Sequence, residues 1–283
     1  MNPFPPPDPV ALLTGANTGI GRIAAVELAR QGWHVVLACR SQDRARPVVE
    51  EIRALRGAGA VTALALDLSD FASVLACAQA FLALDRPLHL LVNNAGLAGA
   101  KGLTKSGFEL AFGVNHMGHF LLTQLLLERI QRSAAARIVT VASRAHYRAP
   151  GIDWEAVRRS TASRSGLPEY SVAKLCNVLF SAELARRLAG SGVTSYSLHP
   201  GVVATEIWRS LPWPFEPLIK LFMLSPEEGT RTTMHCATSP AVAGETGLYY
   251  DQCRPKWPSR LAQDPVLAGE LWRRSEQWLQ SAT

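Results

Sequence analysis

Two side chains four residues apart, Tyr170 and Lys174, form the pair in this sequence that is best suited to proton transfer. On a helix this spacing puts both on one face, so the phenol and the ammonium group can point into the same cleft. A free tyrosine, with a pKa near ~10, is a poor base at neutral pH, and lowering that pKa by roughly 2–3 units needs about 3–4 kcal/mol. One exposed ion pair supplies only about 0–1 kcal/mol, so the pair requires a sheltered site and a second positive charge.

A second signal is a glycine-rich turn between a short apolar run at 10–13 and a helical pattern: Thr14-Gly15-Ala16-Asn17-Thr18-Gly19-Ile20-Gly21. At such a turn the backbone N–H groups and the helix dipole face outward, and glycines let a pyrophosphate come close. The spacing GxxxGxG differs from the usual GxGxxG fingerprint, and no GK[ST] sequence of a P-loop follows it. The turn by itself is a weak signal for a phosphorylated cofactor.

Strand-like and helix-like segments alternate along the chain. Apolar strands are predicted at 10–13, 34–38, 61–66, 88–92, 138–141, 193–198 and 248–250. Helices are predicted at 20–31, from Ser41 towards Gly57, from a cap at Ser69 to about 84, at 107–132, from before Tyr170 to about 190, at 226–236, and at the end of the chain. Continuously apolar strands that alternate with helices imply a parallel sheet covered on both faces. We expect a proline-rich extension at 1–9 and then one doubly wound, Rossmann-type α/β domain over 10–283.

The composition is that of a globular protein, with 48% hydrophobic and 18% charged residues. The net charge of +6 is modest and the arginines are scattered, so no nucleic-acid site is predicted. The five cysteines are widely spaced without a CxxC pair, which argues against disulfides and zinc and favours a reducing compartment. No apolar run reaches the length of a membrane span, so a cytoplasmic protein is expected, with peripheral membrane contact left open.

Further motifs follow the TGxxxGIG turn in an order that is more specific than any one of them. These are Asn93-Asn94-Ala95-Gly96, Asn115, Ser143, Tyr170-x-x-x-Lys174 and Pro200-Gly201. With them the chain resembles the short-chain dehydrogenase/reductase family from residue 10 to about 253. The stretches at 37–41 (LACRS), 114–120 (VNHMGHF) and 199–201 (HPG) resemble its retinol dehydrogenase-like group.

The resemblance implies roles for individual residues. Tyr170 would be the general acid/base, with Lys174 as its activator and a ribose ligand, and Ser143 would hydrogen-bond the reacting oxygen. Asn115 would hold a helix bend and a water that relays protons from Lys174. An oxidised nicotinamide ring would supply the second positive charge. The residues implied in cofactor binding are Gly15, Asn17, Thr18, Gly19, Ile20, Gly21, Arg40, Asp67, Leu68, Asn94, Ala95, Gly96, Tyr170, Lys174, Pro200, Gly201, Val203 and Thr205.

The end of the second strand predicts which nicotinamide cofactor is bound. An acidic residue there would hydrogen-bond the 2′-hydroxyl of NAD, whereas an arginine accommodates the 2′-phosphate of NADP. Cys39 stands at the acidic position and Arg40 follows it, which favours NADP(H) over NAD(H). The alternative is that Arg40 is only a surface residue.

Two features depart from the family pattern. Many relatives have the serine about a dozen residues before the tyrosine, where this chain has Val157 and Arg158; Ser143 is preferred because it ends an apolar strand at the expected ligand crevice. Secondly, the sequence before the first strand lacks the membrane anchor of many members of the retinol dehydrogenase-like group. This puts membrane residence in doubt.

The sequence therefore predicts an NADP(H)-dependent oxidoreductase that transfers hydride between nicotinamide and a carbonyl/alcohol group of an apolar substrate, such as a retinal-like compound or a long-chain aldehyde or ketone. The aromatic, proline-containing segment 205–224 is predicted to be a substrate lid, with packing against the protein body or a membrane as alternatives. A homo-oligomer is expected through the helices at 107–132 and 167–190. His116 and His119 have no third ligand at motif spacing, so structural roles are favoured and no metal site is predicted.

Two other functions remain as alternatives. One is a catalytically silent NADP(H)-binding regulatory or scaffold protein, which the intact set of Asn115, Ser143, Tyr170 and Lys174 disfavours. The other is a sugar-nucleotide epimerase or dehydratase of the related extended type, which also uses YxxxK. The spacing of the glycine turn and the short region after residue 200 disfavour it.

Overall fold

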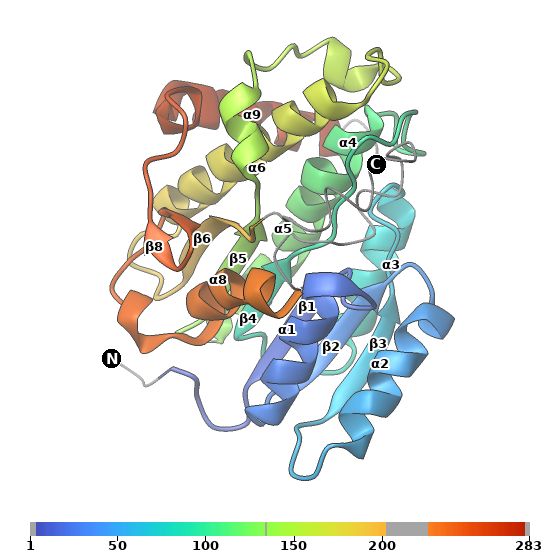
Figure 1. Cartoon of the computed structure of the whole chain (residues 1–283), viewed down its shortest axis with the longest axis vertical. Coiled ribbons are helices and arrows are strands. Elements are labelled where there is room, and N and C mark those ends of the chain that lie inside the picture. Colours follow the sequence, from blue (N-terminus) through green and yellow to red (C-terminus); the bar gives the residue numbers. More distant parts are fainter. Residues whose placement is uncertain (1–3, 134, 202–225, 281–283) are drawn as a thin grey trace.

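The computed structural model describes residues 4–133, 135–201 and 226–280, and these form one eight-stranded sheet with helices on both faces (Figure 1). The strands stand in the order β3 (Val61–Ala65), β2 (His34–Cys39), β1 (Val10–Thr14), β4 (Leu90–Asn93), β5 (Arg137–Val141), β6 (Thr194–His199), β7 (Tyr249–Asp251) and β8 (Arg254–Pro255). All neighbours pair in parallel except β7 and β8, which are antiparallel. The chain reverses its direction of winding between β1 and β4, which is where such sheets open a ligand crevice.

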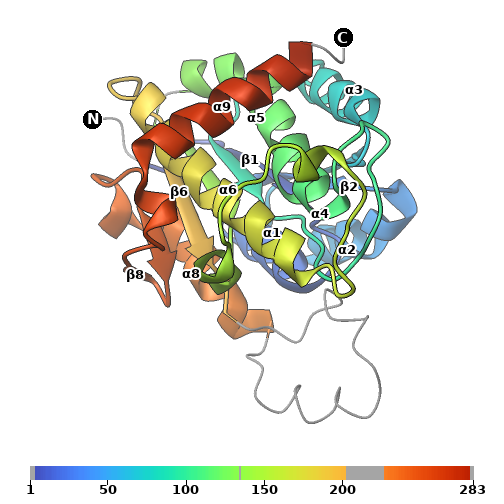
Figure 2. The ribbon, with the colours of Figure 1, turned by 90° about the horizontal axis from the view of Figure 1, so that it is seen from above.

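The helices form two layers. One face of the sheet packs against α1 (Gly19–Arg30), α2 (Gln42–Ala54) and α8 (Pro226–Thr238), and the other against α3 (Phe71–Leu82), α5 (Gly118–Arg132) and α6 (Leu167–Arg187). The last helix, α9 (Pro265–Gln280), lies outside α6 (Figure 2). Among the described residues, no helix combines the length and the apolar character needed to cross a membrane.

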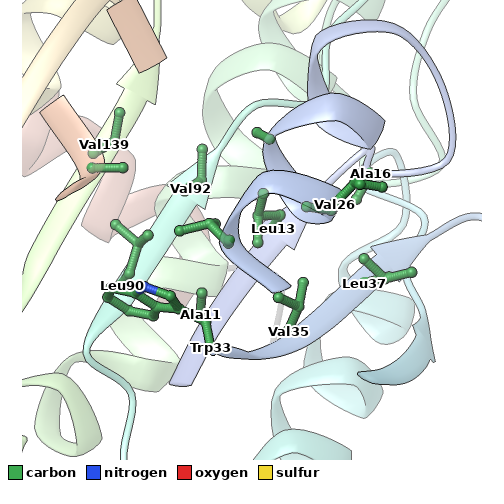
Figure 3. Packing of buried hydrophobic residues seen from close by; sticks show 14 of the residues in the cluster. Ala11, Leu13, Ala16, Val26, Trp33, Val35, Leu37, Leu90, Val92 and Val139 are labelled. Atoms are coloured by element: carbon green, nitrogen blue, oxygen red, sulfur yellow. The ribbon is translucent and has the colours of Figure 1, made fainter. Parts of the chain in front are cut away.

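The central strands are buried on both faces, as their continuous apolar sequence predicts. Along β1 every residue is buried. Alternate side chains serve opposite layers, with Leu13 among the residues under α1 and Leu12 among those under α5. Figure 3 shows the first of these clusters, in which Trp33 closes one end of the layer between β1, β2 and α1. The predicted fold class is confirmed.

Two local predictions are wrong, and one short strand was missed. The single helix expected over 107–132 is divided into α4 (Leu110–Phe112), a π-helical turn (Gly113–Met117) and α5. The cap of α3 is Asp70, whose side chain accepts the N–H of Ala72 at 3.0 Å, whereas Ser69 Oγ donates to the Asp67 carboxylate. Strand β8 was not predicted, because its two exposed residues carry no apolar pattern.

The last helix packs against α6, one of the two helices through which a homo-oligomer is predicted. The Trp272 ring stacks on Phe180 with ring centroids 5.8 Å apart, and it meets Phe120 edge-on at 5.0 Å. Ser275 Oγ lies 3.3 Å from Nε2 of His116. Figure 2 shows α9 running across α6 towards α5. This contact occupies the part of α6 around Phe180, and the homo-oligomer through the helices at 107–132 and 167–190 stays a prediction.

Candidate active site

Four parallel strands end at the edge of the sheet where folds of this type bind ligands. β1 ends at Thr14 and leads into the glycine turn, β4 ends before residues 94–96, β5 ends two residues before Ser143, and residues 200–201 follow β6. The helix α6 carries the predicted tyrosine and lysine within its first eight residues, and it packs against β5 and the segment after it. Segments far apart in the sequence therefore meet at one crevice.

The structure brings Tyr170, Ser143 and Lys174 together. Tyr170 is 8% exposed and Lys174 is 2% exposed. The Ser143 side chain lies beside the phenol of Tyr170 and acts to lower its pKa, and Ser143 Oγ accepts the N–H of Ala145 at 3.1 Å. Lys174 Nζ lies 5.7 Å from the centre of the Tyr170 ring and donates to the carbonyl oxygen of Val141 at 2.8 Å. The pair predicted from spacing alone therefore shares one sheltered site.

The pKa values of Tyr170 and Lys174 show that the protein alone does not favour the charged form of either side chain. Burial raises the pKa of Tyr170, and the hydrogen bond with Ser143 opposes this rise without overcoming it. Burial also lowers the pKa of Lys174 to about 7. Both shifts disfavour the charged forms, because neither group is compensated by an opposite charge in the buried site. The site therefore needs an additional positive charge before the pKa of Tyr170 can fall below its ordinary value.

Asn115 is fully buried in the π-helical turn, beside the segment that follows β4. Its side chain makes a two-point contact with Leu97: Oδ1 accepts the Leu97 N–H at 2.9 Å and Nδ2 donates to the Leu97 oxygen at 3.0 Å. Gly96 keeps the neighbouring space open, because a Cβ atom there would lie 3.1 Å from Asn115 Oδ1 and 3.5 Å from Lys174 Nζ. The helix irregularity that the family resemblance implies at Asn115 is therefore a π-turn.

The glycine turn packs tightly on the segment after β4. Gly15 has a φ of +65°, and a Cβ atom there would lie 2.9 Å from Cα of Ala95. At Gly21 a Cβ would collide with the oxygen of Gly15 and lie 2.6 Å from Nδ2 of Asn94. Asn94 Nδ2 also donates to the Thr14 oxygen at 2.8 Å. Glycine is thus required at both positions by close approach, and the left-handed φ is a further reason at Gly15.

The start of α1 is suited to an anion. Within the described residues, the exposed N-cap Thr18 makes no side-chain capping bond, and the first turn of α1 holds no acidic residue. Asn17, Gly19 and Ile20 around it are half-buried, and Gly19 has a φ of +54°. The N–H groups of this turn and the positive end of the helix dipole are therefore available to a phosphate group. The residues present fit the pyrophosphate of a dinucleotide.

The ends of β2 and β3 border the same edge of the sheet. The Cys39 thiol is buried, and burial raises its pKa to about 11 against the opposing effect of the N–H groups of Ala16 and Asn17. Arg40 is exposed and forms no ion pair with any residue that the structure describes. After β3, Asp67 Oδ1 accepts the N–H of Ser69 at 2.9 Å. Leu68 follows and is buried, with its backbone against α5 at Gly118.

Some predicted site residues lie outside the described residues, namely Val203, Thr205 and the proposed lid segment 205–224. Pro200 and Gly201 are described, and Gly201 has a φ of +92° at the end of β6. In the described parts of the chain, no group of three His, Cys, Asp or Glu side chains could hold a metal ion. His116 instead packs among aromatic rings, including that of Phe112 at 5.2 Å.

Sequence reasoning missed two residues that hold the site in place. His146 is fully buried; its Nδ1–H donates to the Ser143 oxygen at 2.6 Å and its Nε2 accepts the Ser259 N–H at 3.1 Å. Asn177 Nδ2 donates to the Val141 oxygen at 3.2 Å, the same atom that Lys174 binds. The spacing of Asn177 from Lys174, three residues along one helix, was a usable signal. No local pattern connects His146 with residue 259.

An apolar pocket of about 530 Å³ lies elsewhere, between α6, α9 and the segment after β8. Its lining on α6 begins at Val178, roughly 12 Å along the helix from Tyr170 at a rise of about 1.5 Å per residue. Arg186, one further turn beyond Ala182, lines its far end. This pocket is therefore separate from the Tyr170 site.

Known proteins share both this sequence and this fold. The family model described as short chain dehydrogenase matches residues 9–213. Retinol dehydrogenase 11 of Homo sapiens is 43% identical over 270 residues, which cover 94% of this chain and 84% of that protein. A solved structure of an uncharacterised protein from Mycobacterium paratuberculosis is 32% identical, with a TM-score of 0.77, and the match covers 96% of this chain and 93% of that one. The 3-ketoacyl-(acyl-carrier-protein) reductase of Brucella melitensis, solved as a complex with NADH, is 27% identical with a TM-score of 0.65 over 86% of this chain and 96% of that one. This chain belongs to the short-chain dehydrogenase family and is similar to its retinol dehydrogenases.

Proposed function

We propose that this protein is an NADP(H)-dependent oxidoreductase that transfers hydride between nicotinamide and a carbonyl/alcohol group of an apolar substrate. The observation that carries the proposal is that Tyr170 and Lys174 are buried side by side, with Ser143 next to the phenol, at the crevice that the glycine turn borders. Membership of a dehydrogenase family supports the reaction class, and the name of the human relative supports an apolar alcohol or aldehyde.

Each residue of the site has a role in the reducing direction. The bound cofactor supplies the hydride and, once oxidised, a positive charge near the site. The Ser143 hydroxyl donates a hydrogen bond to the substrate carbonyl oxygen, and Tyr170 gives that oxygen its proton. The ammonium group of Lys174 stabilises the phenolate that remains, and Asn115 fixes the segment beside Lys174. The carbonyl carbon gains two electrons and becomes an alcohol carbon.

A phosphate-binding role for the first βα unit follows from its chemistry. Gly15 and Gly21 allow close approach of a pyrophosphate, and the uncapped start of α1 provides N–H donors. NADP(H) is preferred in this proposal because the buried Cys39 thiol is not an acceptor of the kind that selects NAD, whereas Arg40 is exposed and can pair with a 2′-phosphate.

Substitution of Arg40 tests the cofactor preference. The wild type is expected to use NADPH with a kcat/KM at least about tenfold above that for NADH, since one charge-assisted contact gives roughly 1.5–3 kcal/mol. Arg40→Asp should reverse or abolish this ratio, because a carboxylate repels the 2′-phosphate. Arg53→Asp is the matched control, because it makes the same charge change at an exposed position near the opposite end of α2. Equal or better use of NADH by the wild type would refute the assignment of Arg40.

A substrate panel tests the reaction itself. Purified protein with NADPH should reduce retinal or long-chain aldehydes, and small polar carbonyl compounds should react more slowly. Stoichiometric formation of the alcohol, followed by chromatography, ties cofactor oxidation to the substrate. Tight NADPH binding without turnover on any carbonyl compound would instead support the catalytically silent alternative.

A further inference from the structure

His119 is a buried histidine in α5, immediately after the π-turn, and it has no part in the mechanism above. It is 2% exposed. Its Nε2 lies 2.9 Å from the hydroxyl oxygen of Thr14, the last residue of β1 before the glycine turn. Its Nδ1 lies 3.0 Å from the backbone oxygen of Asn115 in the π-turn. One side chain therefore connects the cofactor-binding turn with the segment that positions Asn115.

The hydrogen-bond partners fix the tautomer of His119. The Asn115 oxygen can only accept, so Nδ1 carries the proton and donates to it. Thr14 Oγ1 already accepts the N–H groups of Asn94 and Ala95, both at 2.9 Å. Its lone pairs are thus used, so the hydroxyl donates its own proton, with Nε2 of His119 at 2.9 Å as the near acceptor and the Val92 oxygen at 3.4 Å as the distant one. A protonated imidazole would have no acceptor at Nε2, and burial together with the charge of Lys174 lowers the pKa of His119 to about 4.

A single directed path results from these bonds. It runs from the backbone of Asn94 and Ala95 through the Thr14 hydroxyl and the His119 ring to the Asn115 oxygen. The side chain of Asn115 returns to the segment after β4 through Leu97. Asn115 is therefore held at both its side chain and its backbone, and both anchors lie on residues that border the crevice.

We propose that His119 is a positioning residue, which fixes the π-turn at Asn115 relative to the glycine turn through its Nδ1–H. The inference rests on the proposed function, since Asn115 affects turnover only if Lys174 and Tyr170 transfer protons. The Nδ1 bond is the part that matters for turnover, because Thr14 retains its bonds to Asn94 and Ala95 without the imidazole. Loss of that bond should loosen the π-turn and leave cofactor binding nearly unchanged.

Two substitutions test the roles of the two ring nitrogens of His119 separately. His119→Asn places an amide where Nδ1 stands and can keep the bond to the Asn115 oxygen. His119→Gln places its amide where Nε2 stands and can keep only the bond with Thr14. We expect His119→Gln to lower kcat by about three- to tenfold, the equivalent of one buried hydrogen bond, with the Kd for NADPH unchanged within about twofold. His119→Asn should retain kcat within about twofold. If the His119 ring had only a packing role, kcat would not be lower in the glutamine variant than in the asparagine variant.

Hydrogen exchange of the cofactor-free protein gives a readout that does not depend on activity. Amides of residues 113–118 should exchange faster in His119→Gln than in the wild type, and His119→Asn should resemble the wild type. The control is His89→Gln, because His89 Nδ1 is also buried and accepts the N–H of Val10 at the opposite end of the same strand β1. It should leave both kcat and the exchange of 113–118 unchanged.

The outcomes distinguish the two proposals. Faster exchange in His119→Gln with no turnover in any variant, including the wild type, would uphold the positioning role and refute the proposed function. Equal exchange and equal kcat in the asparagine and glutamine variants would overturn the positioning role. So would an asparagine variant that is more impaired than the glutamine variant.

Discussion

The two helical segments that carry the proposed proton-transfer residues differ in how their side chains are positioned. α6 is a regular helix of 21 residues, in which Tyr170 and Lys174 share a face because they are four residues apart. Asn115 lies in a π-turn between α4 and α5, and its position depends on Leu97 and His119. In the first segment local spacing positions the reactive groups, whereas in the second tertiary contacts do so.

Close approach explains why the second segment contains glycine at both of its ends. A Cβ atom at Gly113 would collide with Cγ2 of Thr104. A Cβ atom at Gly118 would lie 2.5 Å from the oxygen of Leu68 and 3.0 Å from its Cα. The segment is therefore pressed between the chain at residue 104 and the loop after β3. At the regular helix the corresponding glycine stands at the N-cap, where a Cβ atom at Gly166 would lie 2.9 Å from the oxygen of Ala100.

The largest expected effect is at the regular helix. Tyr170→Phe removes only the phenolic hydroxyl, so turnover should fall by roughly 10²–10⁴-fold, the usual contribution of a general acid. The Kd for NADPH should change little, as measured by fluorescence titration. Tyr147→Phe is a suitable control, because its hydroxyl is in an exposed side chain and donates to the Trp257 oxygen away from the site. Substantial turnover by Tyr170→Phe would remove the basis for the proposed mechanism.

The second prediction concerns the charge that α6 buries. The pKa of Lys174 is about 7 in the folded protein and about 10.4 in an unfolded chain, so the unfolded state binds more protons between these values. The cost of burying the ammonium group therefore lowers the free energy of unfolding by its full amount below about pH 7. This cost declines as the pH rises towards 10.4. Lys174→Met removes this cost and should stabilise the cofactor-free protein more at pH 6 than at pH 9, by on the order of 2 kcal/mol.

Denaturant unfolding at the two pH values measures this difference. The bond from Lys174 Nζ to the Val141 oxygen changes from a charged to a neutral donor between the two pH values, so it belongs to the same pH-dependent difference. Asn177 donates to that oxygen at both pH values, so its contribution cancels in the comparison. If the effect of Lys174→Met on stability is the same at both pH values, the pKa of Lys174 is not lowered in the folded protein. The same variant should lack turnover at either pH, because the group that stabilises the phenolate is absent.

The contrast between the helices also explains which features the sequence predicts. The parallel sheet, the glycine turn and the Tyr170–Lys174 face follow from continuously apolar strands, from the 3.6-residue period of helices and from the location of glycines after a strand. The π-turn follows from none of these patterns, and the bonds that hold it join residues 18 positions apart at Leu97 and link His119 to Thr14 across 105 positions. A single helix was therefore predicted where the structure has three parts.

The sequence does not predict where α9 packs, for a similar reason. Its aromatic residues predict a buried face but not the surface that it covers. Only the structure shows that Trp272 contacts both Phe120 on α5 and Phe180 on α6. The pKa of Tyr170 likewise depends on burial and on Ser143, 27 residues earlier, and these oppose one another. Motif spacing identifies the reactive residues but not the balance of forces on them.

The last prediction tests the close packing of the irregular segment directly. Gly118→Ala places a methyl group against the backbone of Leu68, which cannot move as a flexible side chain can, so it should destabilise the protein by roughly 1–3 kcal/mol. Gly269→Ala is the matched control within α9, because no atom lies within 4 Å of a Cβ there. It should be neutral or stabilising by up to about 1 kcal/mol, as expected for glycine replaced by alanine inside a helix. Thermal and denaturant unfolding measure both changes. If the two alanine variants gain or lose stability equally, the π-turn is not held by the approach of α5 to the loop after β3, and its cause must be sought in the bonds of Asn115 and His119 alone.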